Sequence, residues 1–224
     1  MCPTIRLRSI SRTTSGSLKM EDLQRVILVH YHEIGLKGHN RSKFEKRLVR
    51  NLEALLIDYP LVTIHRISGR LIVFLKEGCD KDVAFECARF TSRVPGVARV
   101  SCGFKCERDM DAMGDIAKLA LSEAAPFESF KVSARRAHTD FPIDSMQMNR
   151  DIGAVLCEAN PDASVKMKNP DVTVGVEVVQ NAVYIYAFSI PGIGGLPVGV
   201  SGKVVCLLSS GIDSPVALWR MARR

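Results

Sequence analysis

Residues 25–31 read RVILVHY, and this run with the segment after it decides the fold of the first half of the chain. A continuous apolar stretch rich in β-branched residues is typical of a buried strand. After a glycine-punctuated loop at 35–38, Ser42-Lys-Phe-Glu45 has the form of a capping box and predicts a helix over residues 42–57. The apolar residues of this helix recur three and four positions apart, at Phe44, Leu48, Leu52, Leu55 and Leu56.

The next segments extend this pattern. Residues 61–66 and 70–76 alternate like a hairpin that turns at Ser68-Gly69, and a helix near 80–91 and a strand near 97–104 follow. The order β-α-β-β-α-β predicts a ferredoxin-like domain.

A second α/β stretch follows in the sequence. A helix is predicted over 109–125, a strand over 129–134, a helix capped by Ser145, and a hairpin of 172–179 and 182–188 that turns at Gln180-Asn181. The two helices present apolar faces at Met113, Ile116, Ala117, Ala120 and Leu121 and at Met148, Ile152, Val155 and Leu156. The sequence therefore predicts a mixed α/β chain with two such units.

A glycine- and proline-rich linker precedes Lys203-Val-Val-Cys-Leu-Leu208, which reads as a buried parallel strand with Cys206 in its core. We expect a leader or mis-assigned start at 1–20, a first domain at 21–78 whose pattern extends to about 105, and a second at 79–190. The linker then covers 191–202, and 203–224 begins a third domain that is truncated at Arg224.

Composition sets limits on function. The chain has a net charge of +7, of which residues 1–20, basic and free of acids, supply +4, so a polyanionic partner has to be argued from local charge. No apolar run approaches the ~20 residues of a membrane helix. The seven cysteines and five histidines show no metal-ligand spacing, so we expect reduced cytosolic thiols and no metal site formed by these residues.

The strongest chemical motif is Leu207-Leu208-Ser209-Ser210-Gly211-Ile212-Asp213-Ser214-Pro215. Small residues between a strand and a helix starting near Pro215 let backbone amides approach a phosphate, and the helix N-terminus adds partial positive charge. Ser209 and Ser214 can donate hydroxyl hydrogen bonds, and Asp213 can brace the loop or help to hold Mg²⁺. The spacing is not that of a Walker loop.

This loop resembles the SGGxDS motif of PP-loop ATP pyrophosphatases, with Ser210 where that family has its first glycine. Three further stretches, in order, are similar to ThiI, the family of tRNA 4-thiouridine synthetases or tRNA sulfurtransferases. They are Tyr31-His32-Glu33-Ile34-x-Leu36-Lys37-Gly38-x-Asn40-Arg41-x-x-Phe44, Arg136-x4-Phe141-Pro142-x2-Ser145 with Asn169-Pro170-Asp171, and Gly194-Gly195-Leu196-Pro197-Val198-Gly199. The resemblance runs from about residue 25 to the end of the chain.

The resemblance implies a ferredoxin-like domain, a THUMP domain and the start of a PP-loop domain. It implies a cytoplasmic enzyme that uses ATP and Mg²⁺ to adenylate uridine 8 of tRNA and replaces its C4 oxygen with sulfur from a cysteine desulfurase. Some members also pass sulfur toward thiamine synthesis, and a homodimer stays open. The ATP site would be Leu207, Leu208, Ser209, Ser210, Gly211, Asp213 and Ser214, with Asp213 and Ser214 as the catalytic candidates.

Two alternatives compete with the sulfurtransferase. The chain could be a tRNA-binding module without catalysis, or another THUMP-bearing RNA enzyme such as a methyltransferase, against which the Ser209–Ser214 loop argues. RNA-binding candidates on the first helix and the loop before it are Lys37, Arg41, Lys43, Lys46, Arg47 and Arg50, opposite its apolar face. The resemblance to THUMP domains, which bind the acceptor end of tRNA, adds Lys131, Arg135, Arg136, Lys166 and Lys168.

Overall fold

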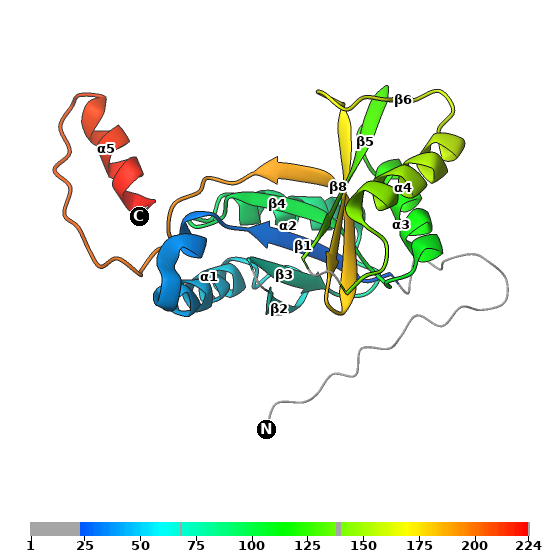
Figure 1. Ribbon diagram of the computed structural model, residues 1–224. Coiled ribbons are helices and arrows are strands. Elements are labelled where there is room, and N and C mark those ends of the chain that lie inside the picture. The colour runs from blue at the N-terminus through cyan, green and yellow to red at the C-terminus, as the bar shows by residue number, and fades with distance from the viewer. Residues whose placement is uncertain (1–22, 68, 138–139, 224) are drawn as a thin grey trace.

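The computed structural model describes residues 23–67, 69–137 and 140–223 (Figure 1). The expectation for residues 1–20 therefore lies outside the described chain. Eight strands form one sheet in the order β2-β3-β1-β4-β8-β7-β5-β6. Every pairing is antiparallel except those that β5 makes with β6 and β7. No helix in the described ranges has the length and apolar character that a membrane span requires.

The predicted β-α-β-β-α-β order is confirmed in the first part of the chain, the ferredoxin-like part. Its elements are β1 (Arg25–His30), α1 (Arg41–Leu55), β2 (Leu61–Ile67), β3 (Arg70–Leu75), α2 (Lys81–Ser92) and β4 (Arg99–Cys106). Leu48, Leu52 and Leu56 from the first helical segment pack with Ala84 and Ala88 of α2 against one face of the strands. The loop expected after β1 is instead a 3-10 helix, η2 (Glu33–Asn40), with Gly38 at a positive φ of 50°.

Two predicted details of α1 are wrong. The helix begins one residue earlier, and its N-cap residue Asn40 makes no side-chain cap hydrogen bond within the described chain. Glu45 does not complete a capping box, because its buried carboxylate accepts from the hydroxyl of Tyr31 and from Nε of Arg41 at 2.8 Å. Leu55, expected on the apolar face, is 40% exposed, because the last turn of α1 rotates it away while Leu56 enters the core.

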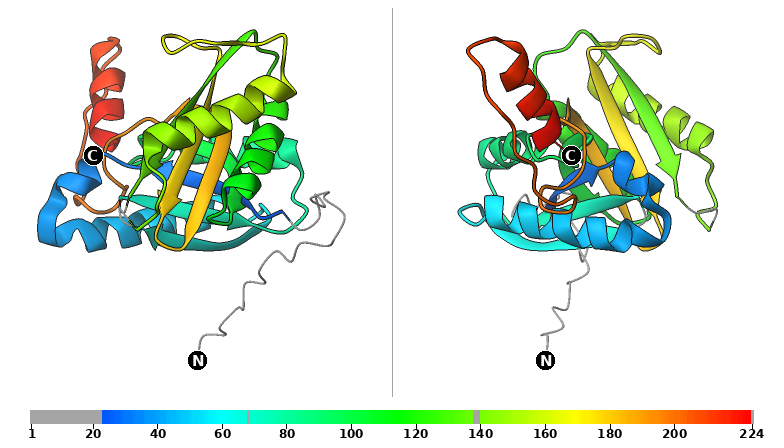
Figure 2. Two further views of the ribbon diagram at one scale, coloured as in Figure 1. Left: turned by 45° about the vertical axis from the view of Figure 1, so that its right-hand side comes forward. Right: turned by 90° about the vertical axis from the view of Figure 1, so that its left-hand side faces the viewer.

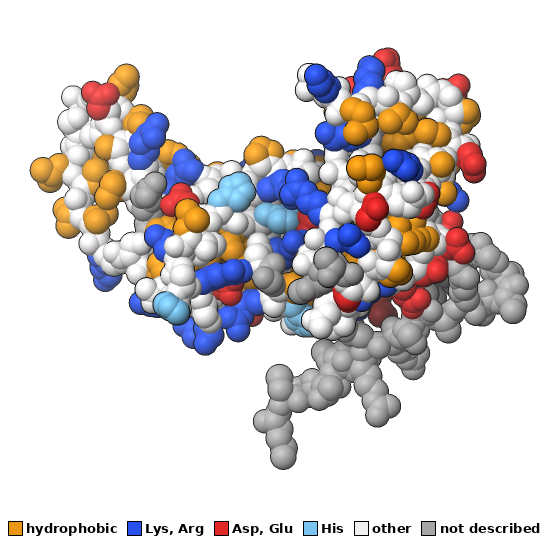
Figure 3. Space-filling view, in the orientation of Figure 1, with side chains coloured by type: hydrophobic (Ala, Val, Ile, Leu, Met, Phe, Trp, Pro, Cys, Tyr) orange, Lys and Arg blue, Asp and Glu red, His pale blue; other side chains and the backbone are white. Residues whose placement is uncertain are grey.

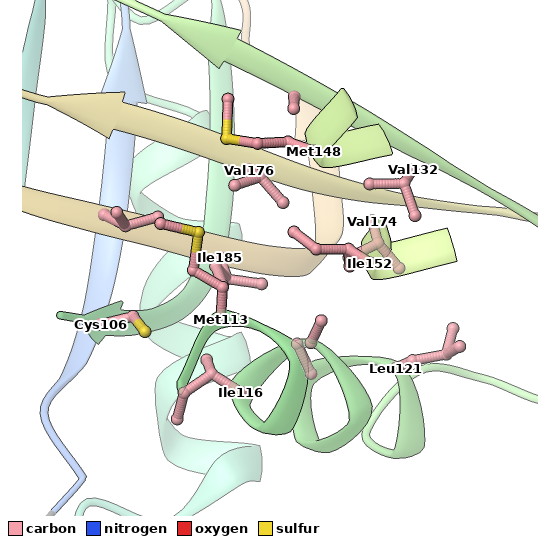
Figure 4. Close-up of a cluster of buried hydrophobic side chains, with 14 of the residues drawn as sticks. Cys106, Met113, Ile116, Leu121, Val132, Met148, Ile152, Val174, Val176 and Ile185 are labelled. Atoms are coloured by element: carbon pink, nitrogen blue, oxygen red, sulfur yellow. The ribbon is translucent and has the colours of Figure 1, made fainter. Parts of the chain in front are cut away.

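The second part consists of α3 (Met110–Ser122), β5 (Ser129–Arg136), α4 (Ser145–Ala159), β6 (Ser164–Val165), β7 (Val172–Val179) and β8 (Ala182–Pro191). Its predicted strands and helices are confirmed, except that Asp144 rather than Ser145 caps α4, accepting from the amides of Met146 and Gln147. In Figure 4, Met113 and Ile116 of α3 and Met148 and Ile152 of α4 point toward the strand residues that they bury.

The two parts share one strongly bent sheet. The helices α1 and α2 cover one face of the ferredoxin-like part, and α3 and α4 cover one face of the second part (Figures 1 and 2). The two remaining faces meet in a third core. It joins Val26, Leu28, Ile72 and Phe74 of the ferredoxin-like part with Val179, Ala182, Tyr184 and Tyr186 of the second part.

The bend occurs where β4 passes β8. Their register shifts between Cys102 and Gly103, and a Cβ on Gly103 would lie 2.0 Å from the carbonyl oxygen of Ile185. Glycine is therefore the residue that permits this close approach of two backbones.

After β8 the chain runs along the turn that precedes β4. Gly192 and Gly194 donate backbone hydrogen bonds to Ala98 and Val97, and Leu196 is buried. The described residues 203–208 form no strand, so the prediction of a buried strand with a core Cys206 is wrong for this chain. Val205 and Leu207 are 95% and 88% exposed, because no strand of the described residues lies beside them to cover them. The predicted helix follows as α5 (Asp213–Ala222).

A polar cluster closes one end of the third core. Its centre is Glu177, 2% exposed, which contacts side chains from β1, β3, β4 and β8. His30 of β1 lies 3.0 Å from this carboxylate. Burial, followed by the positive charges of Arg99, Arg70 and Arg135, lowers the pKa of His30 to about 3. His30 is therefore neutral in the folded protein at physiological pH.

This buried histidine makes stability depend on pH. Between pH 6.5 and about 3, His30 is protonated in the unfolded chain but not in the folded chain. The free energy of unfolding therefore decreases as the pH falls through this window. The His30→Gln variant retains a donor for Glu177 but does not titrate. Between pH 7 and 5 we expect the thermal midpoint of the native chain to fall by about 3 °C more than that of the variant.

Differential scanning calorimetry across this range measures the difference. Val62→Thr, an exposed change in β2 that removes no titratable group, is the control and should keep the native pH dependence. Parallel curves for the native chain and His30→Gln would contradict the assignment.

Candidate functional site

A polar groove of about 420 Å³ opens beside the bend, on the sheet face that α3 and α4 leave uncovered. Strands β4, β5, β7 and β8 all contribute to it. Its lining consists of Arg99, Lys131, Ser133, Arg135, Asp171, Val172, Thr173, Gly175, Tyr186, Ala187 and Ser189. Three cations and several hydroxyl groups therefore face one concave surface that contains a single acid.

Strand alternation explains this lining. Phe130, Val132 and Ala134 of β5 point into the helix-covered core, so Lys131, Ser133 and Arg135 must point to the opposite face. Gly175 makes room for the ring of Tyr186 at the floor of the groove, because a Cβ there would lie 2.3 Å from that ring.

The single acid of the groove, Asp171, is hydrogen-bonded within the fold. One carboxylate oxygen of Asp171 accepts from the backbone amides of Glu128 and Ser129 and from the Ser129 hydroxyl, at 2.8–3.1 Å. These hydrogen bonds lower the pKa of Asp171, with that of the Ser129 hydroxyl the largest cause. Asp171 therefore braces the start of β5, and the lysine and arginine side chains dominate the charge of the groove.

The structure separates the other predicted residues of the second part. Arg136 lies on the helix-covered side of β5 by alternation, and its guanidinium donates to the carbonyl oxygen of Phe141 at 2.8 Å. Lys166 and Lys168 are exposed in the loop after β6. Lys131 links this loop to the groove, because its Nζ lies 3.5 Å from the carbonyl oxygen of Met167.

The predicted basic face of α1 forms a second concave surface, of about 550 Å³. It is lined by Ser42, Lys43, Lys46, Arg47, Arg50, Gly199 and Val200. In Figure 3, Lys and Arg side chains gather at the lower left, over α1, and in the hollow between the two parts. Lys43, Lys46 and Arg50 are exposed there.

Three members of the first predicted RNA-binding set have partners within the protein. Arg47 donates through Nε to the carbonyl oxygen of Val198 at 2.8 Å, and so holds the segment after β8 against α1. Arg41 is hydrogen-bonded to Glu45 and to the hydroxyl of Tyr31. Lys37 lies over the ring of Phe44, with Nζ 5.5 Å from the ring centre.

The predicted nucleotide loop keeps a compact turn. The amide of Ser209 donates to Oγ of Ser214 at 2.9 Å, the two hydroxyl oxygens lie 3.1 Å apart, and the amide of Gly211 lies 3.4 Å from Oγ of Ser209. Ile212 precedes α5 and supplies no side-chain cap among the described residues. The first amides of α5 thus fit an anion such as a phosphate. Ser210 and Asp213 are exposed beside them.

Sequence reasoning missed the groove residues Arg99, Ser133, Thr173 and Ser189. Ser133 and Thr173 could have been found, because each alternates with apolar residues on a predicted strand. Arg99 and Ser189 gave no such indication, since they reach the groove only through the pairing of β4 with β8.

The buried cysteines are not candidates for nucleophilic chemistry. Burial raises the pKa of the Cys87, Cys102 and Cys106 thiols to about 12, which leaves them protonated.

Family models match three consecutive stretches of the chain. They are the ThiI ferredoxin-like domain at residues 26–101, the THUMP domain at 107–187 and the Thiamine biosynthesis protein (ThiI) at 199–224. A Thermoanaerobacter protein (strain X514) named "Probable tRNA sulfurtransferase" is 37% identical over 202 residues, which are 90% of this chain and 51% of that protein. The chain thus spans about half the length of the curated relatives it matches.

Two solved structures share the fold. The crystal structure of a 4-thiouridine synthetase–RNA complex with bound ATP has a TM-score of 0.73 at 34% identity, over 90% of this chain and 50% of that one. A crystal structure of a Pyrococcus horikoshii protein has a TM-score of 0.76 at 29% identity, over 89% of this chain and 66% of that one. With three matching family models in consecutive order and this likeness along most of its length, the chain belongs to the ThiI family.

Proposed function

We propose that this chain supplies the tRNA-binding part of an ATP-dependent tRNA sulfurtransferase that converts uridine 8 into 4-thiouridine. The observation that carries the proposal is the groove, where three cations and four hydroxyl-bearing side chains converge at the junction of the two parts. Its support from relatives is a 4-thiouridine synthetase of the same fold that was solved with RNA and ATP.

The groove is suited to the acceptor end of tRNA. Arg99, Lys131 and Arg135 can neutralise phosphates, and hydroxyl groups beside them can donate to phosphate or ribose oxygens. Its one aromatic lining residue, Tyr186, is 6% exposed and offers little ring surface for base stacking. Recognition by shape and phosphate position fits this surface better than base readout. The exposed Lys43, Lys46 and Arg50 of α1 extend the basic surface.

The Ser209–Ser214 loop is the part proposed to hold the nucleotide. The amides at the start of α5 and the hydroxyls of Ser209 and Ser214 would bind phosphate oxygens, Leu207, Leu208, Ser210 and Gly211 would bring backbone near the nucleotide, and Asp213 would help to hold Mg²⁺. ATP, when bound, supplies the adenylyl group that makes the C4 oxygen of uridine 8 a leaving group. A cysteine desulfurase would supply the persulfide sulfur that replaces this oxygen.

Several finer points stay predictions. They are the domain boundaries, a cytoplasmic location, a homodimer and a role in thiamine synthesis, which the description of the third family model favours.

A second candidate function is favoured by the exposed 203–212 segment. Among the described residues no strand covers Val205 and Leu207, an arrangement that suits a module for tRNA binding without catalysis.

Replacing groove cations should weaken tRNA binding and reduce its salt dependence. We expect Lys131→Ala with Arg135→Ala to lower tRNA affinity about tenfold and to reduce the slope of log affinity against log salt by about 1.5, since about two phosphate contacts are lost. Filter binding or fluorescence anisotropy between 50 and 200 mM salt measures both quantities.

Lys76→Ala with Lys118→Ala removes the same charge outside both basic surfaces and is the matched control. Equal losses in the two double variants would mean that only overall charge matters. No binding by the native chain at low salt would overturn the proposed function.

The nucleotide loop is tested in a protein that continues through a complete nucleotide domain. Asp213→Ala should reduce thiolation of uridine 8 by about 100-fold while leaving tRNA affinity unchanged, because the lost carboxylate acts on the nucleotide and not on the RNA. Ser201→Ala, an exposed change ahead of the loop, is the control. Undiminished thiolation by Asp213→Ala would show that the loop is a structural turn.

A further inference from the structure

Glu177 stands at the centre of a set of basic side chains that come from both parts of the chain. Its carboxylate is contacted by Nη1 of Arg70, lies 3.0 Å from Nε2 of His30 and 3.6 Å from Nη2 of Arg99, and accepts from the hydroxyl of Tyr186 at 2.9 Å. Strands β1, β3 and β4 belong to the ferredoxin-like part, whereas β7 and β8 belong to the second. One buried carboxylate therefore holds three side chains across the junction of the two parts.

The charges of this cluster do not balance. Arg70, Arg99 and Arg135 gather around one buried acid, since the positive charge of all three acts on His30, while His30 itself is neutral. The buried carboxylate stabilises the fold only while it keeps its contacts with the surrounding cations. Removal of this carboxylate would leave their positive charge uncompensated. The excess cations face the groove, which Arg99 and Arg135 line.

The hydrogen-bonding roles follow from the carboxylate. An ionised carboxylate only accepts, so Nε2 of His30 must carry the proton that it donates to Glu177. The Arg99 guanidinium lies 3.4 Å from the same nitrogen, but two donors cannot bond to one another. Of the two described side chains beside the Arg99 guanidinium, His30 and Glu177, only Glu177 can accept from it and hold it at the groove wall.

We propose that Glu177 is a positioning residue for RNA binding, which orients Arg99 at the groove and fixes the ferredoxin-like part against the second part. The inference rests on the proposed tRNA-binding function. This role of Glu177 predicts a change in RNA affinity opposite to the change that net charge alone would cause. Neutralising Glu177 removes a negative charge beside a polyanion site, which by itself would tighten RNA binding. Loss of positioning instead weakens it.

The variant Glu177→Gln keeps the shape of the side chain and an oxygen that can accept from Tyr186. In the 224-residue chain, well below its thermal midpoint, we expect this variant to bind a tRNA transcript about tenfold more weakly at physiological salt. The Arg99→Ala change should weaken binding by the native chain several-fold but cause no further loss when added to Glu177→Gln. Such non-additivity identifies two residues that act as one unit.

The matched control is Glu123→Gln. Glu123, the C-cap residue of α3, also pairs with an arginine of the other part, since its Oε2 accepts from Nη1 of Arg25 at 2.7 Å, but it lies outside the groove lining. We expect this control to lower the thermal midpoint without changing tRNA affinity. Glu177→Asp, which restores the charge, should recover part of the lost affinity.

If Glu177→Gln does not fold, Tyr186→Phe tests the same point by removing one donor to the carboxylate, with an expected loss of about two- to threefold. Native tRNA binding together with equal or tighter binding by these variants would overturn the inference alone. Absence of tRNA binding by the native chain would overturn the proposed function and the inference with it.

Discussion

The pairing of β4 with β8 is the constraint on which the rest of the structure depends. Strand β8 serves three cores: Ile185 packs under α3 and α4, Tyr184 and Tyr186 lie between the two bare faces, and Phe188 stacks on Phe85 of α2 at 4.2 Å. A separate hinge between the parts is therefore impossible without breaking strand hydrogen bonds and uncovering apolar side chains. The groove exists because this shared strand bends, so its geometry is a property of the junction and not of either part alone.

The local part of this architecture could be predicted from sequence, and the non-local part could not. Apolar periodicity found α3 with its buried residues Met113 and Ile116, and turn residues found the β7–β8 hairpin, because both depend on neighbours within about ten positions. The β4–β8 pairing joins residues that are 77 to 92 positions apart, from Cys106 with Val183 to Arg99 with Pro191, and has no local pattern. The capping box failed for a related reason: Glu45 has a better partner in Tyr31, which the sequence places on another element.

The same distinction applies to the candidate site. A helical wheel places Lys43, Lys46, Arg47 and Arg50 on one face, and the structure does bring them to one concave surface. The wheel cannot reveal that Arg47 also holds Val198, because that contact depends on where the chain goes after β8. Of the predicted RNA-binding residues, only Lys131 and Arg135 line the groove. Arg99 also lines it, because the pairing of β4 with β8 places it there. Likewise, the loop at Ser209–Ser214 forms its turn locally, whereas the strand before it needs partners from elsewhere.

The basic residues of this chain therefore have two roles, ion pairing within the fold and availability to an anion, which composition alone cannot distinguish. Arg25, Arg41 and Arg70 form ion pairs with acids inside the fold, and their charge is largely neutralised there. Lys43, Lys46 and Lys131 have no ion pair with an acid among the described residues, and their charge remains available to an anion. Arg99 combines the two tasks, since it is tied to Glu177 at one end of the groove and is still 36% exposed. A cation held in this way reaches a phosphate with little conformational entropy left to lose, which is how a modest net charge would support the proposed recognition of tRNA.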